Sequence, residues 1–314
     1  MRIGLDVMGG DFAPDAVIEG AVDALPLFAE GDRLVLIGDL AIINNKLEDL
    51  GTDPSHFEIV HASQVIEMGD SPSKAFTHKP DSSIVVGYKL LADKEIDGFC
   101  SAGNTGAMLV GASHTVNVIP GVLRPALAAL VPRLDGKRSI LLDAGLNPDC
   151  KVDVLAQYGV LGTIFAKNVL GVENPTVKLL NIGSEETKGT PMVKAAYELM
   201  KENPNINFGG NIEANELFAE GMAEVIVCDG FVGNIVLKET EAIYHLFKKR
   251  IANMNDSFFE SLNFETVGGT PVIGINANVI IGHGVSKRKA IMNMIKQTCD
   301  VVRIDLAQKI KESI

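Results

Sequence analysis

Short apolar runs alternate along this chain with longer stretches of helical periodicity, and this alternation limits the fold more than any other feature. The short runs are rich in Val, Ile and Leu and apolar on both faces, which is typical of strands covered by helices on each side. Strands are predicted at Ile3–Val7, Leu34–Ile37, Phe57–Val60, Gly98–Cys100, Ala126–Val131, Ile140–Leu142, Val177–Ile182, Val225–Cys228 and Val279–Ile281. Helices are predicted at Asp15–Leu27, Ser82–Lys94, Asn104–Val118, Val152–Leu170, Pro191–Glu202, Ile235–Met254 and Ser286–Glu312. This order predicts a layered α/β/α fold with a mostly parallel sheet.

No linker or repeat interrupts the chain, so we expect a single α/β catalytic domain over residues 1–314. The segment 237–267 differs in character, because an amphipathic helix is followed there by a second short helical stretch. Two helices that leave the sheet and return would form a protruding hairpin. Amphipathicity leaves two interpretations open: surface helices packed on their own domain, or contact with a second subunit or a membrane.

The composition excludes several classes of function. A formal net charge of −12 argues against nucleic acid as the main partner, since neutralising phosphates needs an excess of Lys and Arg. The four cysteines lie far apart without a CxxC pair, so we expect no disulfide framework, no zinc site and a reducing cytoplasm. The start of the chain lacks a signal-peptide layout. Residues 98–123 carry no Asp, Glu, Lys or Arg, but Gly, Pro and polar residues interrupt them, which favours a buried loop and helix over a membrane span.

The common cofactor and catalytic motifs of α/β proteins are absent from the sequence. It contains no GxGxxG dinucleotide fingerprint, no P-loop, no HExxH and no GxSxG. These absences exclude the commonest cofactor-dependent interpretations of an α/β chain of this size.

Turns rich in Gly and Asn follow six of the predicted strands. They are Met8–Asp11, Ser101–Gly106, Asp143–Asn147, Gly183–Gly189, Asp229–Asn234 and His283–Ser286. Ligands of open parallel sheets bind outside the carboxyl ends of the strands, so we expect these turns to meet at one crevice. Glycine admits the backbone close to a ligand, which suits such a crevice.

The turn Ser101–Gly106 is the strongest candidate for an anion site. Its glycines, Gly103 among them, let successive N–H groups point inward, and Ser101, Asn104 and Thr105 add donors at a predicted helix N-terminus. Such an end carries partial positive charge and N–H groups without partners, which suits phosphate. The alternative is an ordinary strand-to-helix turn in which Asn or Thr serves only as the helix cap.

The motifs of these turns, taken in order, carry a resemblance to a known family. They are GLDVMGGDFAP at the start, SAGNTGA at 101–107, RPALA at 124–128, LLDAG at 141–145, LLNIGSEETKG at 179–189, GNIEANE at 210–216, VIVCDGFVGN at 225–234, and GGTPVIGI and IIGHG towards the C-terminus. Together they resemble the bacterial phosphate acyltransferases, the acyl-ACP:phosphate transacylases of phospholipid synthesis. The chain departs from the family pattern at Phe12, where the family usually has His.

The resemblance implies an activity and its partners. Inorganic phosphate attacks the thioester of long-chain acyl-[acyl-carrier-protein] in a reversible reaction, and the acyl phosphate passes to a membrane glycerol-3-phosphate acyltransferase. It also implies a fold similar to the isocitrate-dehydrogenase and phosphotransacetylase group, a homodimer and no organic cofactor. A cytoplasmic location, with peripheral attachment at the inner face of the plasma membrane, is expected from the same resemblance.

Positioning and electrostatics suit this chemistry, because phosphate is already a nucleophile at neutral pH and needs only to be held and aligned. For phosphate we expect Ser101, Asn104 and Thr105 to act with Lys188. Arg124 either holds phosphate through two hydrogen bonds or is structural, pinned by a carboxylate.

Other groups would act on the thioester. Asn147 and Asn234 are candidate donors to its carbonyl oxygen. His283 would protonate the leaving thiolate or orient phosphate, although a lone His is more often structural. We do not favour Cys100 as a covalent nucleophile, because it ends an apolar strand and a buried thiol reacts poorly.

Docking of the acidic carrier protein requires local positive charge on this acidic chain. Two basic clusters are available: Lys248, Lys249 and Arg250, and Lys287, Arg288 and Lys289. Either would dock the carrier protein or anionic lipid headgroups, and the alternative is a solvated helix face. Two other functions stay open at this point, a short-chain phosphate acyltransferase that uses coenzyme A and a non-catalytic scaffold of lipid synthesis.

Overall fold

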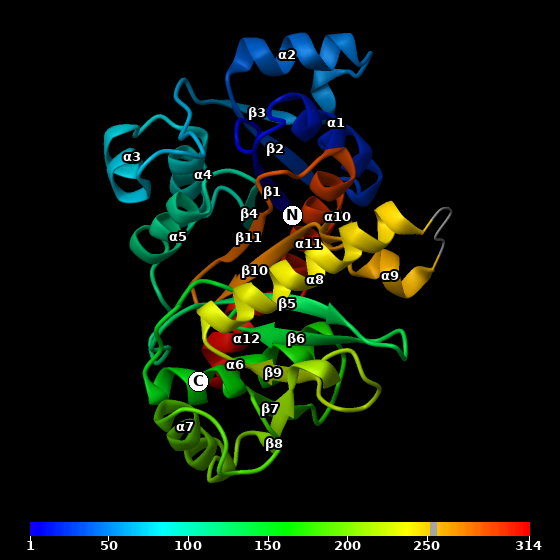
Figure 1. Cartoon of the computed structure of the whole chain (residues 1–314). Coiled ribbons are helices and arrows are strands. Elements are labelled where there is room, and N and C mark those ends of the chain that lie inside the picture. The colour runs from blue at the N-terminus through cyan, green and yellow to red at the C-terminus, as the bar shows by residue number, and fades with distance from the viewer. Residues whose placement is uncertain (252–255) are drawn as a thin grey trace. The chain divides into compact units, whose positions relative to one another are not determined.

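The computed structural model describes residues 1–251 and 256–314, apart from the side chain of residue 264 (Figure 1). The chain divides into two compact units. Unit 1 contains Met1–Val118 and Phe264–Ala307, and unit 2 contains Ile119–Asn263 and Gln308–Ile314. That these units act as one catalytic domain over residues 1–314 stays a prediction.

Unit 1 is built around a sheet with the strand order β3-β2-β1-β4-β11-β10. Neighbouring strands are parallel except for β10 and β11, which are antiparallel. The strands are β1 (Arg2–Asp6), β2 (Arg33–Gly38), β3 (Glu58–His61), β4 (Gly98–Ser101), β10 (Gly269–Ile273) and β11 (Asn278–Gly282). The helices are α1 (Asp15–Ala24), α2 (Leu40–Asp49), α3 (Pro72–His78), α4 (Ser83–Ala92), α5 (Thr105–His114), α10 (Phe264–Val267) and α11 (Arg288–Arg303), with short 3₁₀ turns at Leu25–Leu27 and Pro54–His56.

Helices cover both faces of this sheet, as β4 shows. A Cβ added to Gly98 would lie 2.6 Å from Val302 of α11, whereas one added to Gly87 of α4 would lie 2.3 Å from the ring of Phe99. Since successive residues of a strand face opposite sides, α11 and α4 lie on opposite faces. The strand β4 between them is fully buried, which accounts for its almost wholly apolar sequence.

The strands of unit 2 have the order β5-β6-β9-β7-β8 and are parallel except between β5 and β6. Its strands are β5 (Ala126–Pro132), β6 (Arg138–Leu142), β7 (Thr176–Asn181), β8 (Asn207–Glu213) and β9 (Val225–Val227). Its helices are α6 (Val152–Val169), α7 (Pro191–Lys201), α8 (Gly230–Arg250) and α9 (Ser257–Ser261), with a 3₁₀ turn at Ala214–Glu216. The last helix, α12 (Leu306–Ser313), contains the boundary between the units at residues 307 and 308.

All the predicted strands and all but one of the predicted helices are present, and the layered, mostly parallel α/β fold is confirmed. The prediction missed α2, α3, β8 and β10. The single helix expected at 286–312 is wrong: Asp305, with φ of 50°, separates α11 from α12. Strand β8 was missed because Gly209 and Gly210 interrupt it, and both residues oppose the single residue Lys178 where the register of β7 and β8 shifts. Such a bulge favours glycine.

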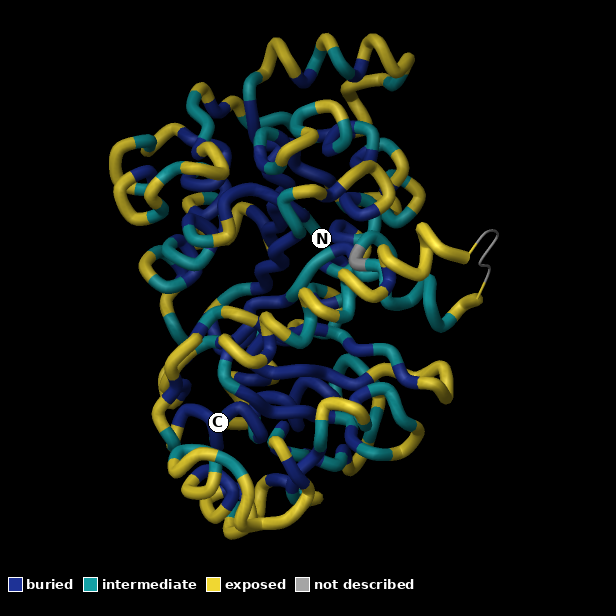
Figure 2. Tube along the Cα trace, viewed as in Figure 1, coloured by how far each residue is buried: buried dark blue, intermediate teal, exposed yellow. Residues whose placement is uncertain are grey.

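The segment 237–267 is helical, as expected, within the residues that the structure describes. α9 folds back onto α8, where the rings of Phe247 and Phe259 lie 5.2 Å apart and the Tyr244 hydroxyl donates to Glu260 at 3.2 Å. Figure 2 shows that most of α8 is exposed or half-buried. In residues 1–251 and 256–314, no helix is both long and apolar enough to cross a membrane. The protrusion of this segment stays a prediction, and Met254 lies outside the described residues.

We predict that Gly162→Ala destabilises the protein. A Cβ at Gly162 would lie 2.3 Å from Cγ1 of Val225, so α6 would be pushed off the sheet of unit 2. The free energy of unfolding should fall by about 1–3 kcal/mol in urea titrations, the usual effect of overpacking. Gly69→Ala is the control, since a Cβ there would meet nothing within 4 Å. Equal stability of the two variants would contradict this account of α6 packing.

Candidate active site

The buried carboxylate of Asp6, at the end of β1, organises the turns of unit 1. Its Oδ2 accepts a hydrogen bond from Ser101 Oγ at 2.6 Å, and its Oδ1 accepts one from the Met8 N–H at 3.0 Å. Ser101 Oγ in turn accepts the Gly103 N–H at 2.9 Å. Burial raises the pKa of the Asp6 carboxyl, and the hydrogen bond from Ser101 opposes this shift. Asp6 therefore ties the turn after β1 to the turn after β4.

Asn104 caps α5, which is the alternative role considered from the sequence. Its Oδ1 accepts the Ala107 N–H at 3.0 Å. Its Nδ2 lies 3.0–3.2 Å from the carbonyl oxygens of Glu67, Met68 and Asp70. Direct phosphate contact by the Asn104 or Ser101 side chain would require some of these bonds to break. The backbone N–H groups of the first helical turn, which have no partner within a helix, are better placed for an anion.

The turn after β11 lies beside the other two turns of unit 1. The Asp11 N–H donates to the Gly284 carbonyl at 2.8 Å, and the Ser286 N–H donates to the His283 carbonyl at 2.9 Å. Gly10, with φ of 112°, lies where all three turns meet, since a Cβ there would be 3.3 Å from both the Ala102 and Gly284 oxygens. Three of the six turns therefore lie together within unit 1, and the half-buried His283 is part of them. That all six meet at one crevice stays a prediction.

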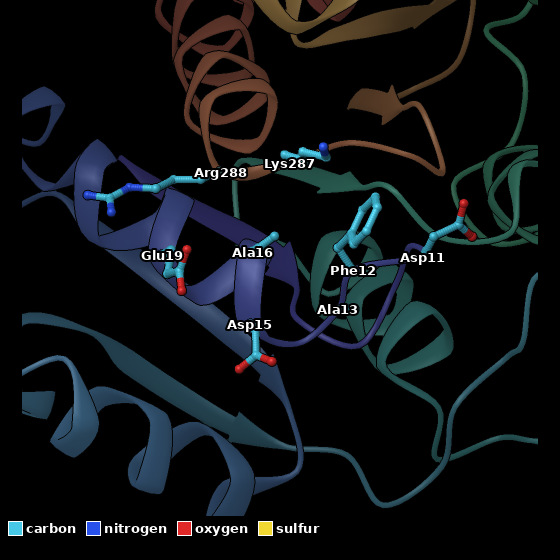
Figure 3. A pocket seen from close by; sticks show the side chains of 8 residues that line it. All are labelled: Asp11, Phe12, Ala13, Asp15, Ala16, Glu19, Lys287 and Arg288. Atoms are coloured by element: carbon cyan, nitrogen blue, oxygen red, sulfur yellow. The ribbon is translucent and has the colours of Figure 1, made fainter.

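A pocket of about 540 Å³ lies beside the turn after β1 (Figure 3). It includes two members of the second basic cluster. Lys287 Nζ lies 5.4 Å from the centre of the Phe12 ring, and Arg288 forms an ion pair with Asp23 that lowers the pKa of the Asp23 carboxyl. These contacts give both side chains partners within unit 1, and all three residues of the cluster, Lys287, Arg288 and Lys289, are exposed.

Asp143, which follows β6, is the counterpart of Asp6 in unit 2. Its fully buried Oδ1 accepts the Leu127 N–H at 2.9 Å, and its Oδ2 accepts the Asn147 N–H at 2.6 Å. Asn147 Nδ2 donates to Asp143 Oδ2 at 3.0 Å and to the Pro125 carbonyl at 2.8 Å. This network joins the turn after β6 to the start of β5, beside the exposed Arg124. For Asn147 to donate to a thioester carbonyl, one of its two bonds would have to break.

The N-terminus of α8 packs directly on the Asp143 turn through two glycines. A Cβ at Gly233 would lie only 1.9 Å from the Asp143 carbonyl oxygen, and the Gly230 N–H donates to the Asn147 carbonyl at 2.8 Å. Asp229 caps the helix by accepting the Val232 N–H at 2.9 Å. The DGFVGN motif thus requires glycine at both positions so that helix and turn can approach.

Two further candidates, Asn234 and Lys188, have exposed side chains in unit 2. Asn234 faces Gly145, where an added Cβ would lie 3.4 Å from the Asn234 Cβ. Lys188 lies in the loop after β7, and its Nζ is 4.0 Å from Glu185 Oε2. The Lys188 carbonyl accepts a hydrogen bond from Asn181 Nδ2 at 3.2 Å, which anchors the loop to the end of β7. Both side chains are accessible to a substrate.

The structure also bears on the remaining candidates. Burial raises the pKa of the Cys100 thiol to about 12, which argues against a nucleophilic role, in line with the sequence analysis. In the first basic cluster, Lys248, Lys249 and Arg250 are all exposed, and Lys248 is paired with Glu260. The roles of all these residues stay predictions.

Sequence reasoning missed the importance of the two buried carboxylates. From the sequence, Asp6 is a candidate for positioning a Lys or Arg partner, and Asp143 is distinguished only as part of its turn. Their signal was present in the sequence: each Asp directly follows an apolar run and precedes a glycine-containing turn.

Comparison with known proteins decides the family. The model of the family described as "Fatty acid synthesis protein" matches residues 1–309. The phosphate acyltransferase of Dictyoglomus turgidum is 40% identical, over 100% of this chain and 98% of its own length. That of Caldicellulosiruptor saccharolyticus is 42% identical over the same shares of the two chains. The chain belongs to the phosphate acyltransferase family. It is therefore an acyltransferase of lipid biosynthesis, as the motifs implied.

Solved structures agree on the fold of this acyltransferase. A phosphotransacetylase from Streptococcus pyogenes superposes with a TM-score of 0.67 at 19% identity, covering 99% of this chain and 94% of its own. A branched-chain phosphotransacylase from Enterococcus faecalis V583 gives 0.62 at 12% identity, covering 96% and 99%. The expected similarity to phosphotransacetylases is confirmed at the level of the fold.

We predict that Ser101→Ala makes stability depend more strongly on pH. The variant removes a donor to Asp6, so the pKa of this buried carboxyl rises further. A carboxyl whose pKa is higher in the folded state adds stability only at low pH and loses it as the pH rises through that pKa. The variant should lose about 1–3 kcal/mol of unfolding free energy at neutral pH, and less in acid.

Urea titrations over a range of pH measure this difference. Ser184→Ala, which alters an exposed serine of unit 2, is the control and should match the parent protein at every pH. A deficit for Ser101→Ala that stays constant from neutral to acid pH would show that Ser101 does not act through the Asp6 carboxyl.

Proposed function

We propose that this acyltransferase forms acyl phosphate from long-chain acyl-[acyl-carrier-protein] and inorganic phosphate, and so supplies glycerol-3-phosphate acylation in phospholipid synthesis. The observation that carries the proposal is the match of the whole chain to phosphate acyltransferases at 40–42% identity. The glycine-rich turns at the carboxyl ends of the strands, three of which are held by the buried carboxylates of Asp6 and Asp143, support it.

The reaction needs no covalent intermediate on the enzyme. An oxygen of hydrogen phosphate attacks the thioester carbonyl carbon, the new C–O bond replaces the C–S bond, and the phosphate proton ends on the carrier-protein thiol. Alignment of the two reactants contributes about 7–11 kcal/mol in favourable cases. Each donor to the developing oxyanion contributes about 2.7–4 kcal/mol.

We assign phosphate binding to Gly103 and Thr105 at the N-terminus of α5, and Lys188 and Arg124 of unit 2 are further candidates for phosphate. Asn234 is the proposed donor to the carbonyl oxygen, because its side chain is exposed beside Gly145. Ser101, Asn104 and Asn147 would then act chiefly by holding the turns in place, since their polar groups are bonded within their own units. His283 would carry the proton to the thiolate.

The proposed partners are acyl carrier protein, a second copy of the chain and the membrane acyltransferase that consumes acyl phosphate. The exposed basic side chains Lys249, Arg250 and Lys289 provide local positive charge for the acidic carrier on a chain of net charge −12. On α8, Ile243, Leu246 and Phe247 are 40%, 59% and 37% exposed, an apolar stripe suited to a partner subunit or to peripheral attachment at the inner membrane face.

One assay separates this function from its two alternatives. Purified protein is incubated with phosphate and with either long-chain acyl carrier protein or acetyl coenzyme A, and thiol release is recorded. We expect phosphate-dependent release from the carrier protein. Release from acetyl coenzyme A alone would establish the short-chain alternative. If neither substrate releases thiol in a phosphate-dependent way, the remaining alternative is a non-catalytic scaffold of lipid synthesis.

We predict that Lys188→Ala raises the KM for phosphate about tenfold, the size expected for loss of a charge-assisted hydrogen bond. The KM for the acyl carrier protein should stay unchanged, because the carrier docks elsewhere. Lys194→Ala, an exposed lysine on α7 of the same unit, is the matched control. If the two variants have the same KM for phosphate, Lys188 does not bind phosphate.

A further inference from the structure

A cavity of about 510 Å³ lies entirely within unit 2 and has an apolar floor. The floor is formed by Leu155 of α6, Leu179 of β7 and Cys228, which are 1%, 0% and 4% exposed. Burial raises the pKa of the Cys228 thiol well above its ordinary value, so this thiol stays neutral and contributes apolar surface. The volume falls in the range of about 300–1,000 Å³ that is typical of small-molecule sites.

Two helices form the walls of this cavity. Met192 and Val193 come from the first turn of α7, and Val232 and Val236 lie four residues apart on one face of α8. Val232 remains 37% exposed. The walls therefore carry aliphatic side chains with no charged group, so a polar ligand would lose its hydration here without gaining hydrogen bonds.

The three polar side chains that line the cavity come from the end of β7 and from the N-caps of the two helices. Asn181 ends β7 and donates to the Lys188 carbonyl at 3.2 Å, Thr190 caps α7, and Asp229 caps α8. Ile182, beside them, is 81% exposed, an unusual position for a large aliphatic residue. The cavity thus joins a polar rim next to Lys188 to an apolar interior, which matches a ligand with a polar head and an aliphatic tail.

We propose that this cavity binds the hydrocarbon chain of the acyl substrate, with the thioester end at the rim formed by Asn181 and Thr190. This inference rests on the proposed function, because it assigns the acyl chain of that reaction to a place. Lys188 would then hold phosphate next to the end of the chain that reacts. The depth of the cavity between α7 and α8 would set the longest chain that is accepted.

Chain-length selectivity tests the proposal. Val193→Phe and Val236→Phe fill the cavity from α7 and α8, whereas Met192→Ala enlarges it. Binding of free fatty acids of increasing length is measured by calorimetry without phosphate, and thiol release is measured with the matching acyl carrier proteins. The Phe variants should weaken binding and transfer of the longest chains by about tenfold or more, and leave the shortest chains unaffected. Met192→Ala should shift the optimum to longer chains.

Leu199→Phe is the matched control: it adds a similar ring to α7 at a residue that is 46% exposed and lies outside the cavity. Folded Phe variants with an unchanged chain-length profile would overturn the proposal. So would loss of self-association in the same variants without any loss of fatty-acid binding, because a second copy of the chain would then cover the cavity. Fatty-acid binding that is sensitive to Val193→Phe, in a protein without thiol release, would preserve the cavity assignment and refute the proposed function instead.

Discussion

Two buried carboxylates, at the ends of β1 and β6, hold the turns on which the proposed chemistry depends. Asp6 and Asp143 are 1% and 0% exposed, and each accepts hydrogen bonds from its own turn and from the beginning or end of a neighbouring strand. A carboxylate out of water is costly unless several donors surround it. The turns therefore have one arrangement that satisfies the charge, and departures from it leave a buried charge without partners. This explains why rigid turns can be made from residues as flexible as glycine.

Close packing adds a second constraint on the same turns in unit 2. Gly230 and Gly233 lie against the backbone of the Asp143 turn at distances that no side chain would allow. The N-terminus of α8, with its partial positive charge, is thereby brought next to the carboxylate that organises the turn. The hydrogen bonds of the Asp143 carboxylate and the close packing of the two glycines thus favour the same conformation of the turn. Together they specify this conformation more strongly than either would alone.

The sequence predicted the layered fold well because buried parallel strands leave an unmistakable apolar pattern, as in β2 and β4. The prediction failed where the local sequence disfavours the element that forms. In β8, the two glycines are tolerated because they form a bulge opposite a single residue of β7. For the site, the sequence identified the turns but not the use of their side chains. Asn104 and Asn147 looked like free donors, yet each binds carbonyl groups distant in sequence. Such partners follow from tertiary structure and cannot be derived from spacing.

Side chains that are hydrogen-bonded within the protein and side chains that are exposed would act on an anion in different ways. Side chains bonded within the protein do not reorient when substrate arrives, so the backbone N–H groups that they position are fixed before binding. Lys188 and Arg124, the cations proposed for phosphate, are exposed and not held by buried partners. A phosphate dianion needs both contributions, since fixed dipoles align it and flexible cations offset its loss of water. The buried carboxylates do not touch the substrate in this scheme, but without them the aligned dipoles would not exist.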